Sequence, residues 1–203
     1  YASRAGAEVV LLEKNEKLGK KVYITGKGRC NVTNASEREE FLRHVFRNPR
    51  FLYASLAELD NEGLMRLIES EGVPLKTERG NRVFPVSDHS SDIILALKRA
   101  MEKGNVDVRL NAGAESLLIE DGRIAGVKLE TGESISANAV IIATGGVSYP
   151  STGSTGDGYR FAEAAGHTIE TPRASLVPIE TRESWPANLM GLTLKNVRLT
   201  AYA

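Results

Sequence analysis

The sequence has a single cysteine, few aromatic residues, no excess of charge and no long apolar run. Cys30 is the only cysteine among 203 residues, which excludes an intrachain disulfide and favours a reducing compartment, the cytoplasm. Basic and acidic residues number 26 each, and aromatic residues make up 6%. This composition argues against a nucleic-acid partner and against binding to an anionic membrane. No apolar stretch approaches the roughly 20 residues that a transmembrane helix needs.

The sequence also shows no recognisable metal site and no catalytic nucleophile. His44, His89 and His167 have no metal-ligand spacing with Cys30 or with acidic residues, so no metal is predicted. A G-x-S-x-G nucleophile motif is absent. A lone cysteine without a resolving partner is more often a small buried packing residue than a nucleophile. The catalytic residues therefore remain unknown at this level.

Two short apolar runs mark the expected sheet. Ala7–Leu12 reads AEVVLL and Ala139–Ala143 reads AVIIA, which is typical of buried strands in a parallel sheet. Segments with helical periodicity lie between them. This alternation predicts an α/β fold built on a parallel sheet.

Helices and hairpins are expected between these runs. Ser36, followed three residues later by Glu39, has the spacing of a capping box and predicts a helix start. Asp121-Gly122 between two apolar segments is a strong hairpin signal. Further expected elements are helices at 51–59, 64–71, 93–101 and 159–165, and strands at 75–78, 82–84, 106–110, 115–120 and 123–130.

The pattern of the chain changes after Pro172. Residues 176–181 and 192–203 alternate in hydrophobicity like antiparallel strands, around a Trp185-Pro186 loop. We therefore expect one domain over residues 1–172 and the beginning of a mostly β domain over residues 173–203.

Glu13 is the first candidate for a binding role, because it follows the first apolar run directly. In a dinucleotide-binding fold, an acidic residue at this place accepts hydrogen bonds from the ribose hydroxyls. A surface carboxylate at a strand end looks the same in sequence, so position alone leaves both interpretations open. The G-x-G-x-x-G turn that usually lies about 20 residues earlier would fall before Tyr1.

The segment Thr25–Asn34, TGKGRCNVTN, is the second candidate. Its glycines would let backbone N–H groups approach an anion or an aromatic ring closely, and its short polar side chains could reach ligand hydroxyls or carbonyls. It is not a Walker A loop, since Gly28 follows Gly26-Lys27 where that motif has Ser or Thr. An ordinary loop is the alternative, but a loop this polar and glycine-rich favours ligand contact.

Two further segments are rich in small residues. Ala143-Thr144-Gly145-Gly146 ends the second apolar run with a turn that would let the chain pass close to a ligand. Residues 152–159 open a helix, where free N–H groups favour negative charge and Asp157 could accept from hydroxyls. N-capping by Thr155 or Asp157 explains the second segment equally well.

Together and in this order, these segments resemble one family. The matching motifs are 13–15 (EKN), 24–34 (ITGKGRCNVTN), 143–146 (ATGG), 156–158 (GDG) and 191–197 (GLTLKNV). They are similar to those of the bacterial NAD(P)/FAD-dependent oxidoreductases of the aminoacetone oxidase-like group, which includes bile-acid reductase-like members. The 24–34 motif is quite specific, whereas the others are shared with flavoproteins of the glutathione reductase and fumarate reductase kinds.

The resemblance implies a Rossmann-like, glutathione reductase-like FAD-binding domain and the start of an inserted, mostly β, substrate-side domain. Glu13 would hold the adenosine ribose, and Ala114 would offer its backbone to the adenine. It also implies FAD as cofactor, NAD(P)H as a candidate electron donor and a small molecule as substrate. The oligomeric state stays open. The implied cofactor-binding residues are Glu13, Lys14, Gly19, Lys21, Thr25, Gly26, Gly28, Arg29, Cys30, Asn31, Thr33, Ala114, Thr144, Gly145, Gly146, Gly156, Asp157 and Gly158.

Measured against that family, the first glycine-rich turn is missing before Tyr1, and the C-terminal stretch is missing after Ala203. The first strand of the family's sheet would lie between the two apolar runs at 9–12 and 140–143. Without it, both runs would have unpaired edges. We therefore expect a fragment or part of a longer chain, inactive by itself.

Two other functions remain compatible with the sequence. A non-catalytic module could hold FAD or another adenine nucleotide as a structural or sensory ligand. An NAD-linked dehydrogenase would also use Glu13, but it would give the polar loop Thr25–Asn34 no role.

Overall fold

The computed structural model describes residues 1–173, 180–194, 197–198 and 200. The chain divides into two units, Tyr1–Ile169 and Glu170–Ala203. In its described part the second unit contains a 3₁₀ helix, Trp185–Leu189. The strands expected at 176–181 and 192–203 fall partly on residues outside the described ones. The mostly β domain expected from residue 173 onward therefore stays a prediction.

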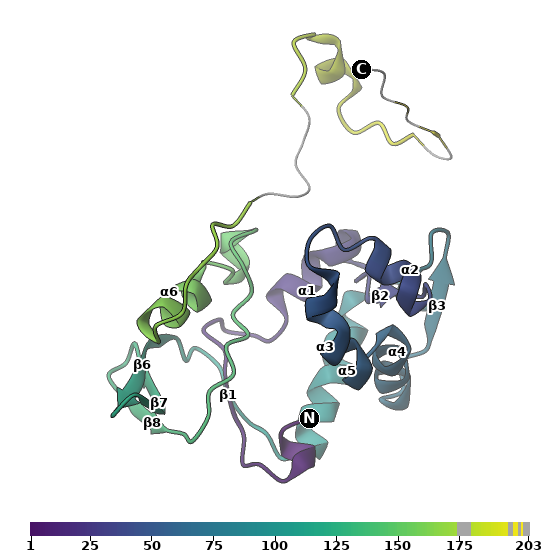
Figure 1. Cartoon of the computed structure of the whole chain (residues 1–203). Helices are drawn as coiled ribbons and strands as arrows, with labels where there is room; N and C mark the ends of the chain where they lie inside the picture. Colours follow the sequence, from purple (N-terminus) through teal and green to yellow (C-terminus); the bar gives the residue numbers. More distant parts are fainter. Residues whose placement is uncertain (174–179, 195–196, 199, 201–203) are drawn as a thin grey trace. The chain divides into compact units, whose positions relative to one another are not determined.

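A parallel pair of strands anchors the first unit. β1 (Val10–Leu12) pairs with β5 (Asp107–Arg109), with Val10 opposite Asp107. The backbone N–H of Glu13 extends the ladder by donating to the carbonyl of Arg109 at 2.9 Å. The long connection between the two strands carries five α-helices and two 3₁₀ helices. Figure 1 shows the α-helices of this connection grouped together. The predicted α/β fold with a parallel sheet is confirmed.

The second apolar run does not form the predicted strand. Residues 139–143 pair with no other strand in the described part of the chain, and Ile141 is 81% exposed. Val140 alone packs against a buried cluster. The prediction was wrong because apolar, β-branched composition gives a strand only where a neighbouring chain supplies hydrogen-bond partners.

The connection between β1 and β5 builds a helical layer around a small antiparallel sheet. The sheet has the order β2-β4-β3, with β2 at Thr33–Asn34, β3 at Leu75–Glu78 and β4 at Arg82–Pro85. The helices are α1 (Lys20–Ile24), α2 (Arg38–Arg43), α3 (Tyr53–Glu58), α4 (Asn61–Ser70) and α5 (Ser90–Lys103).

The capping box predicted at Ser36 is absent. Glu37 occupies the N-cap position of α2, with no capping hydrogen bond from its side chain. The backbone N–H of Ser36 instead donates to Asn34 Oδ1 at 2.9 Å. Asp60 caps α4 as expected of an aspartate, since its side chain accepts from the N–H of Gly63 at 2.7 Å.

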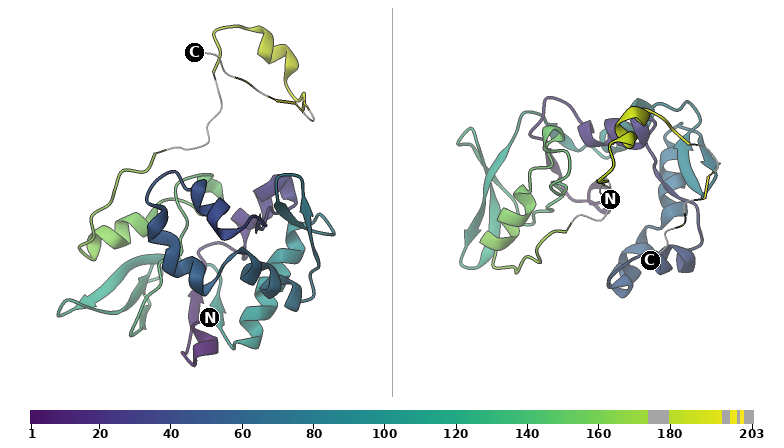
Figure 2. Two further views of the ribbon diagram at one scale, coloured as in Figure 1. Left: turned by 45° about the vertical axis from the view of Figure 1, so that its right-hand side comes forward. Right: turned by 90° about the horizontal axis from the view of Figure 1, so that it is seen from above.

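A three-stranded meander and a helix complete the first unit. β6 (Ala114–Glu120), β7 (Arg123–Leu129) and β8 (Ser134–Ser136) pair antiparallel in chain order. Asp121 and Gly122 both have positive φ, which confirms the predicted two-residue hairpin turn. In Figures 1 and 2, α6 (Asp157–Ala164, light green) lies beside this hairpin.

Two buried clusters stabilise these layers. The first joins Cys30, Ile68, Val73, Ile93 and Ala96, from the loop after α1, from α4 and the turn that follows it, and from α5. The second joins Ala112, Val127 and Leu129, from β7 and the chain after β5. No helix among the described residues combines the length and the apolar character that crossing a bilayer requires.

Candidate functional site

The carboxylate of Glu13 has one anchored oxygen and one open oxygen. Its Oε1 accepts from the backbone N–H of Asn15 at 2.8 Å and from Asn15 Nδ2 at 2.7 Å. No hydrogen bond to Oε2 is recorded from any residue that the structure describes. Asn15 therefore orients the carboxylate, while the second oxygen can accept from an incoming donor.

Lys14 connects the end of β1 to the start of α6. Its Nζ donates to Thr155 Oγ1 and to Asp157 Oδ2, at 2.6 Å in both cases, across 141 and 143 sequence positions. The hydrogen bond from Lys14, followed by that from Thr155, holds the pKa of Asp157 below its usual value. Neither Thr155 nor Asp157 caps α6 with its side chain, because Gly156 is the N-cap residue.

Gly153 allows the close approach that this connection needs. Its φ of +99° lies in the left-handed region, and a Cβ there would lie 2.6 Å from Asn15 Nδ2. Asn15 Nδ2 also donates to the carbonyl oxygen of Thr152 at 3.2 Å. A side chain at residue 153 would therefore push the 152–157 segment away from the end of β1.

The turn at 144–147 packs against the same segment. A Cβ on Gly158 would lie 2.6 Å from Thr144 Oγ1, and one on Gly145 would lie 3.1 Å from Ser154 Oγ. Three segments that are far apart in sequence thus meet after β1. We name them together the strand-end junction, which comprises residues 13–15, 144–147 and 152–158.

Helix α1 reaches the chain beside this junction through Lys21. Its Nζ donates to the carbonyl oxygen of Ser148 at 2.6 Å and lies 4.7 Å from the ring centroid of Tyr149. Gly19 precedes α1 with a φ of +73°, and a Cβ there would lie 2.8 Å from Ile94. Gly19 therefore serves the packing of α1 on α5, and its predicted cofactor contact stays a prediction.

Residues 25–34, which we call the glycine-rich loop, have an unusual backbone. Gly26, Lys27, Gly28 and Cys30 all have positive φ, between 57° and 85°. For the two residues that are not glycine, this conformation costs on the order of 1–3 kcal/mol each. A Cβ on Gly28 would meet no atom within 4 Å, so the backbone there faces open space.

Several side chains of the glycine-rich loop bind protein groups. Thr25 Oγ1 donates to the carbonyl oxygen of Val22 at 2.7 Å, and Thr33 lies within β2. With its amide oriented as its neighbours require, Asn31 donates to the carbonyl oxygens of Val83 and Thr33. Cys30 is 5% exposed, and burial raises the pKa of its thiol. Thr25 and Cys30 are thus turned inward, while Lys27 and Asn31 remain exposed beside the open backbone at Gly28.

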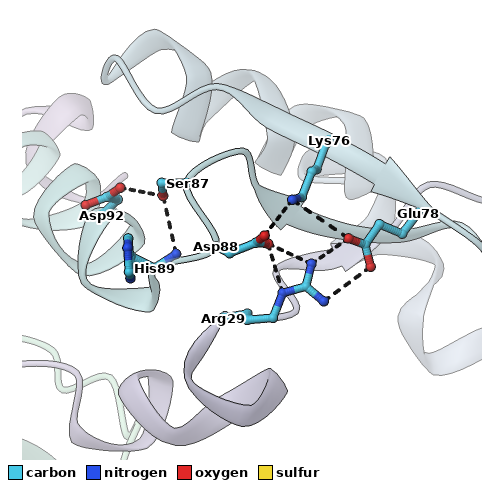
Figure 3. Close-up of polar contacts among 7 residues, drawn as sticks. All are labelled: Arg29, Lys76, Glu78, Ser87, Asp88, His89 and Asp92. Carbon is cyan, nitrogen blue, oxygen red and sulfur yellow. Dashed lines mark hydrogen bonds and ion pairs between the residues drawn. The ribbon is translucent and has the colours of Figure 1, made fainter.

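Arg29 makes more side-chain hydrogen bonds than the other described residues of the loop. It binds the carboxylates of Glu78 and Asp88, from β3 and from the turn before α5 (Figure 3). Neither acid was among the residues expected at the site. They lie 49 and 59 positions after Arg29, and no short-range pattern in the sequence connects them to it.

Ala114, expected to contact an adenine through its backbone, begins β6 opposite Leu129. Its side chain packs against the second buried cluster. The structure describes a cavity of about 160 Å³, lined by Thr33, Arg38, Phe41, Leu56, Leu59, Asp60, Asn61 and Leu64. Thr33 alone among the predicted site residues lines it. The described residues contain no group of three His, Cys, Asp or Glu side chains placed to hold a metal.

A parallel strand that ends in an acidic residue, with a small-residue turn in the same junction, is typical of a Rossmann-type dinucleotide-binding domain. The family model described as "HI0933-like protein Rossmann domain" matches residues 1–200. The chain belongs to this family of Rossmann-type FAD-binding domains, and the resemblance found in the sequence is confirmed.

Curated relatives are about 30% identical to this chain over the aligned residues. A ribosomal RNA dihydrouridine synthase from Escherichia coli (strain K12) is 31% identical over 178 residues, which is 87% of this chain and 43% of the relative. A 3-dehydro-bile acid delta(4,6)-reductase from Clostridium scindens is 30% identical over 189 residues, 89% of this chain and 43% of the relative. The chain thus spans less than half the length of these relatives.

Solved structures support the fold. A flavocytochrome c3 fumarate reductase superposes with a TM-score of 0.63 and 25% identity, covering 81% of this chain and 37% of the other. A 3-ketosteroid-delta4-(5alpha)-dehydrogenase from Rhodococcus jostii RHA1 superposes with a TM-score of 0.53 and 16% identity, covering 73% of this chain and 43% of the other.

Proposed function

We propose that this protein is an FAD-dependent oxidoreductase. The observation that carries the proposal is the strand-end junction. There Lys14 and Asn15, the residues after Glu13, bind the segment 152–158, and the turn at 144–147 packs against that segment. Dinucleotides bind in Rossmann folds at the carboxyl ends of parallel strands, and the junction lies at such an end.

The residues present fit an FAD molecule. The open oxygen of Glu13 is an acceptor suited to the ribose hydroxyls, and Asn15 holds it in one orientation. Gly28 offers backbone without a side chain in open space, as close contact with a ring or phosphate requires. When bound, FAD supplies a group that accepts and gives a hydride. The chain's own residues bind and orient it.

We further propose that the substrate carries a carbon–carbon double bond conjugated with a carbonyl group. The names of three similar proteins support this: a dihydrouridine synthase, a delta(4,6)-reductase of a 3-dehydro-bile acid and a fumarate reductase. Each name describes saturation of a double bond next to a carbonyl or carboxylate. With NAD(P)H as electron donor, NAD(P)H and a proton would be consumed, giving the saturated product and NAD(P)⁺.

We expect a small organic substrate and residence in the cytoplasm, where Cys30 would remain reduced. Residues 173–203 would begin the substrate-side domain. One relative is named for ribosomal RNA, so the substrate screen should contain both small enones and uridine-containing RNA.

The first experiment is an absorption spectrum of the full-length protein that contains this chain, after incubation with FAD and gel filtration, with NAD as the comparison ligand. We expect a retained flavin absorption band and no retained NAD. Anaerobic NADPH should bleach the band, and an enone substrate should restore it. A colourless protein would contradict the proposal, and retention of NAD alone would indicate a dehydrogenase.

A non-catalytic FAD-binding module is the second candidate. It is supported by the glycine-rich loop, where the hydrogen bonds of Thr25, Asn31 and Arg29 go to protein groups. Flavin that binds but is reduced by no donor would favour this candidate.

A further inference from the structure

Arg29 lies at the centre of a network of four charged side chains (Figure 3). Its Nε and Nη2 donate to Asp88 Oδ1 at 2.8 and 2.6 Å. Its Nη2 and Nη1 donate to the two carboxylate oxygens of Glu78 at 2.5 and 3.3 Å. Lys76 Nζ donates to Asp88 Oδ2 at 2.8 Å, so Asp88 binds both cations.

This network connects the glycine-rich loop to two other elements. Glu78 and Lys76 belong to β3, and Asp88 lies in the turn between β4 and α5. The guanidinium of Arg29 also lies over the Phe84 ring, 4.1 Å from its centroid. A Cβ on Gly26 would lie 3.2 Å from the same ring. Phe84 therefore packs against the loop at Gly26 and at Arg29.

The glycine-rich loop is held on its other side by the buried core. Cys30, the residue after Arg29, belongs to the first buried cluster. Adjacent residues thus fix the loop in two ways, one through a polar network and the other through apolar packing. A backbone with left-handed φ at Lys27 and Cys30 persists only where its surroundings hold it, and this pair of anchors does so.

The exposure of these side chains indicates that the network orients the loop backbone rather than stabilises the fold. The side chains of Arg29, Glu78 and Asp88 are 33%, 31% and 44% exposed. Ion pairs this exposed contribute little to global stability. A planar guanidinium held by two carboxylates nevertheless has one preferred geometry, which restricts the backbone that carries it.

We propose that Arg29, Glu78, Asp88 and Lys76 are positioning residues, which hold the Gly26–Cys30 backbone in the conformation that contacts FAD. The inference rests on the proposed function, since it needs FAD as the ligand. The four side chains do not touch the cofactor in this proposal. They act through the loop, by limiting how far its backbone moves when FAD is absent.

The variant Asp88→Asn tests this role. Asparagine tolerates the φ of 60° at this position and keeps one acceptor, but it removes the charge that both cations share. The matched control is Asp107→Asn on β5. Asp107 accepts from Arg109 at 2.9 Å in a similar cluster, where Arg109 also binds Glu133. Both variants should be made in the full-length protein that contains this chain.

We expect Asp88→Asn to weaken FAD binding about tenfold, as removal of an outer partner of a ligand residue does at metal sites. The circular dichroism of the bound flavin should also change. In the FAD-free chain, amide hydrogen exchange should become faster over residues 25–34. Asp107→Asn should change none of these, and the FAD-free forms of both variants should melt at the same temperature.

Each other outcome is decisive. If Asp88→Asn binds FAD with unchanged affinity and spectrum, the positioning role is wrong and the FAD proposal stands. If the unchanged chain does not bind FAD, the proposed function fails and the inference fails with it. If FAD-free Asp88→Asn melts well below Asp107→Asn, the network is structural and the inference is wrong. Glu78→Gln takes the place of Asp88→Asn, with the same readouts, if the latter does not fold.

Discussion

The glycine-rich loop and the strand-end junction are held in place by different means. The loop rests on a buried core through Cys30 and is covered by the Arg29 network. The junction depends on glycine contacts and on hydrogen bonds between partly exposed side chains, such as Lys14 and Asp157. The loop should therefore be sensitive to cavities in the core, and the junction to added side chains and to pH.

The two apolar runs show the same contrast. Residues 10–12 pair with β5 and are partly buried, whereas residues 141–143 of the similar second run are exposed and unpaired. Composition alone does not separate them. The contribution of a buried and of an exposed apolar side chain to the unfolding free energy can be compared by mutation.

The largest effect is expected from Ile68→Ala in the core beneath the loop. Ile68 is 1% exposed, so truncation removes buried apolar surface and leaves a cavity, which costs about 3 kcal/mol of unfolding free energy. Urea unfolding measures the loss. The matched control is Ile141→Ala, at 81% exposure, which should change stability by less than about 0.5 kcal/mol. Equal losses would remove the distinction between the two regions.

Gly153→Ala should have the next largest effect, a loss of about 2 kcal/mol of unfolding free energy. The alanine combines backbone strain with a Cβ that would lie 2.6 Å from Asn15 Nδ2. Gly166→Ala is the control. Its φ of +87° is similar, but a Cβ there would meet no atom within 4 Å. We expect about 1 kcal/mol for Gly166→Ala in the same urea unfolding. If both variants lose the same free energy, the junction does not depend on close approach.

Glu13→Gln should weaken FAD binding about tenfold, or about 1.4 kcal/mol, because the open oxygen loses its charge as an acceptor for hydroxyls. Fluorescence titration with FAD measures the affinity. Glu8→Gln is the control, since Glu8 is exposed and lies before β1. An unchanged affinity for Glu13→Gln would exclude Glu13 from the site.

Asp157→Asn should have the smallest effect. We expect it to lower the unfolding free energy by about 1 kcal/mol at pH 7, because the ion pair with Lys14 is partly exposed. The pKa of Asp157 is lowered in the folded chain, chiefly by Lys14, below the usual value of about 3.9. Its stabilising contribution is therefore complete above about pH 4 and is lost as the pH falls through the lowered pKa. The difference in unfolding free energy between parent and variant should persist at pH 5 and shrink below pH 4. A difference that grows on acidification would contradict this assignment.

The sequence by itself determined the features that depend on neighbouring residues. Asp121-Gly122 predicted a hairpin turn, and the apolar run before Glu13 predicted that Glu13 follows a strand. The glycines of residues 25–34 indicated a backbone that few other residues adopt. These are local preferences of φ and ψ and of strand composition, and they act over a few positions.

Only the tertiary structure decided the partners. Arg29 binds Glu78 and Asp88, Lys14 binds Asp157, Cys30 enters the core, and residues 139–143 remain unpaired. Each of these outcomes depends on which distant segment packs alongside, and local preference does not encode that choice. Burial and hydrogen-bond pairing are properties of the assembled chain, because both depend on atoms contributed by other segments.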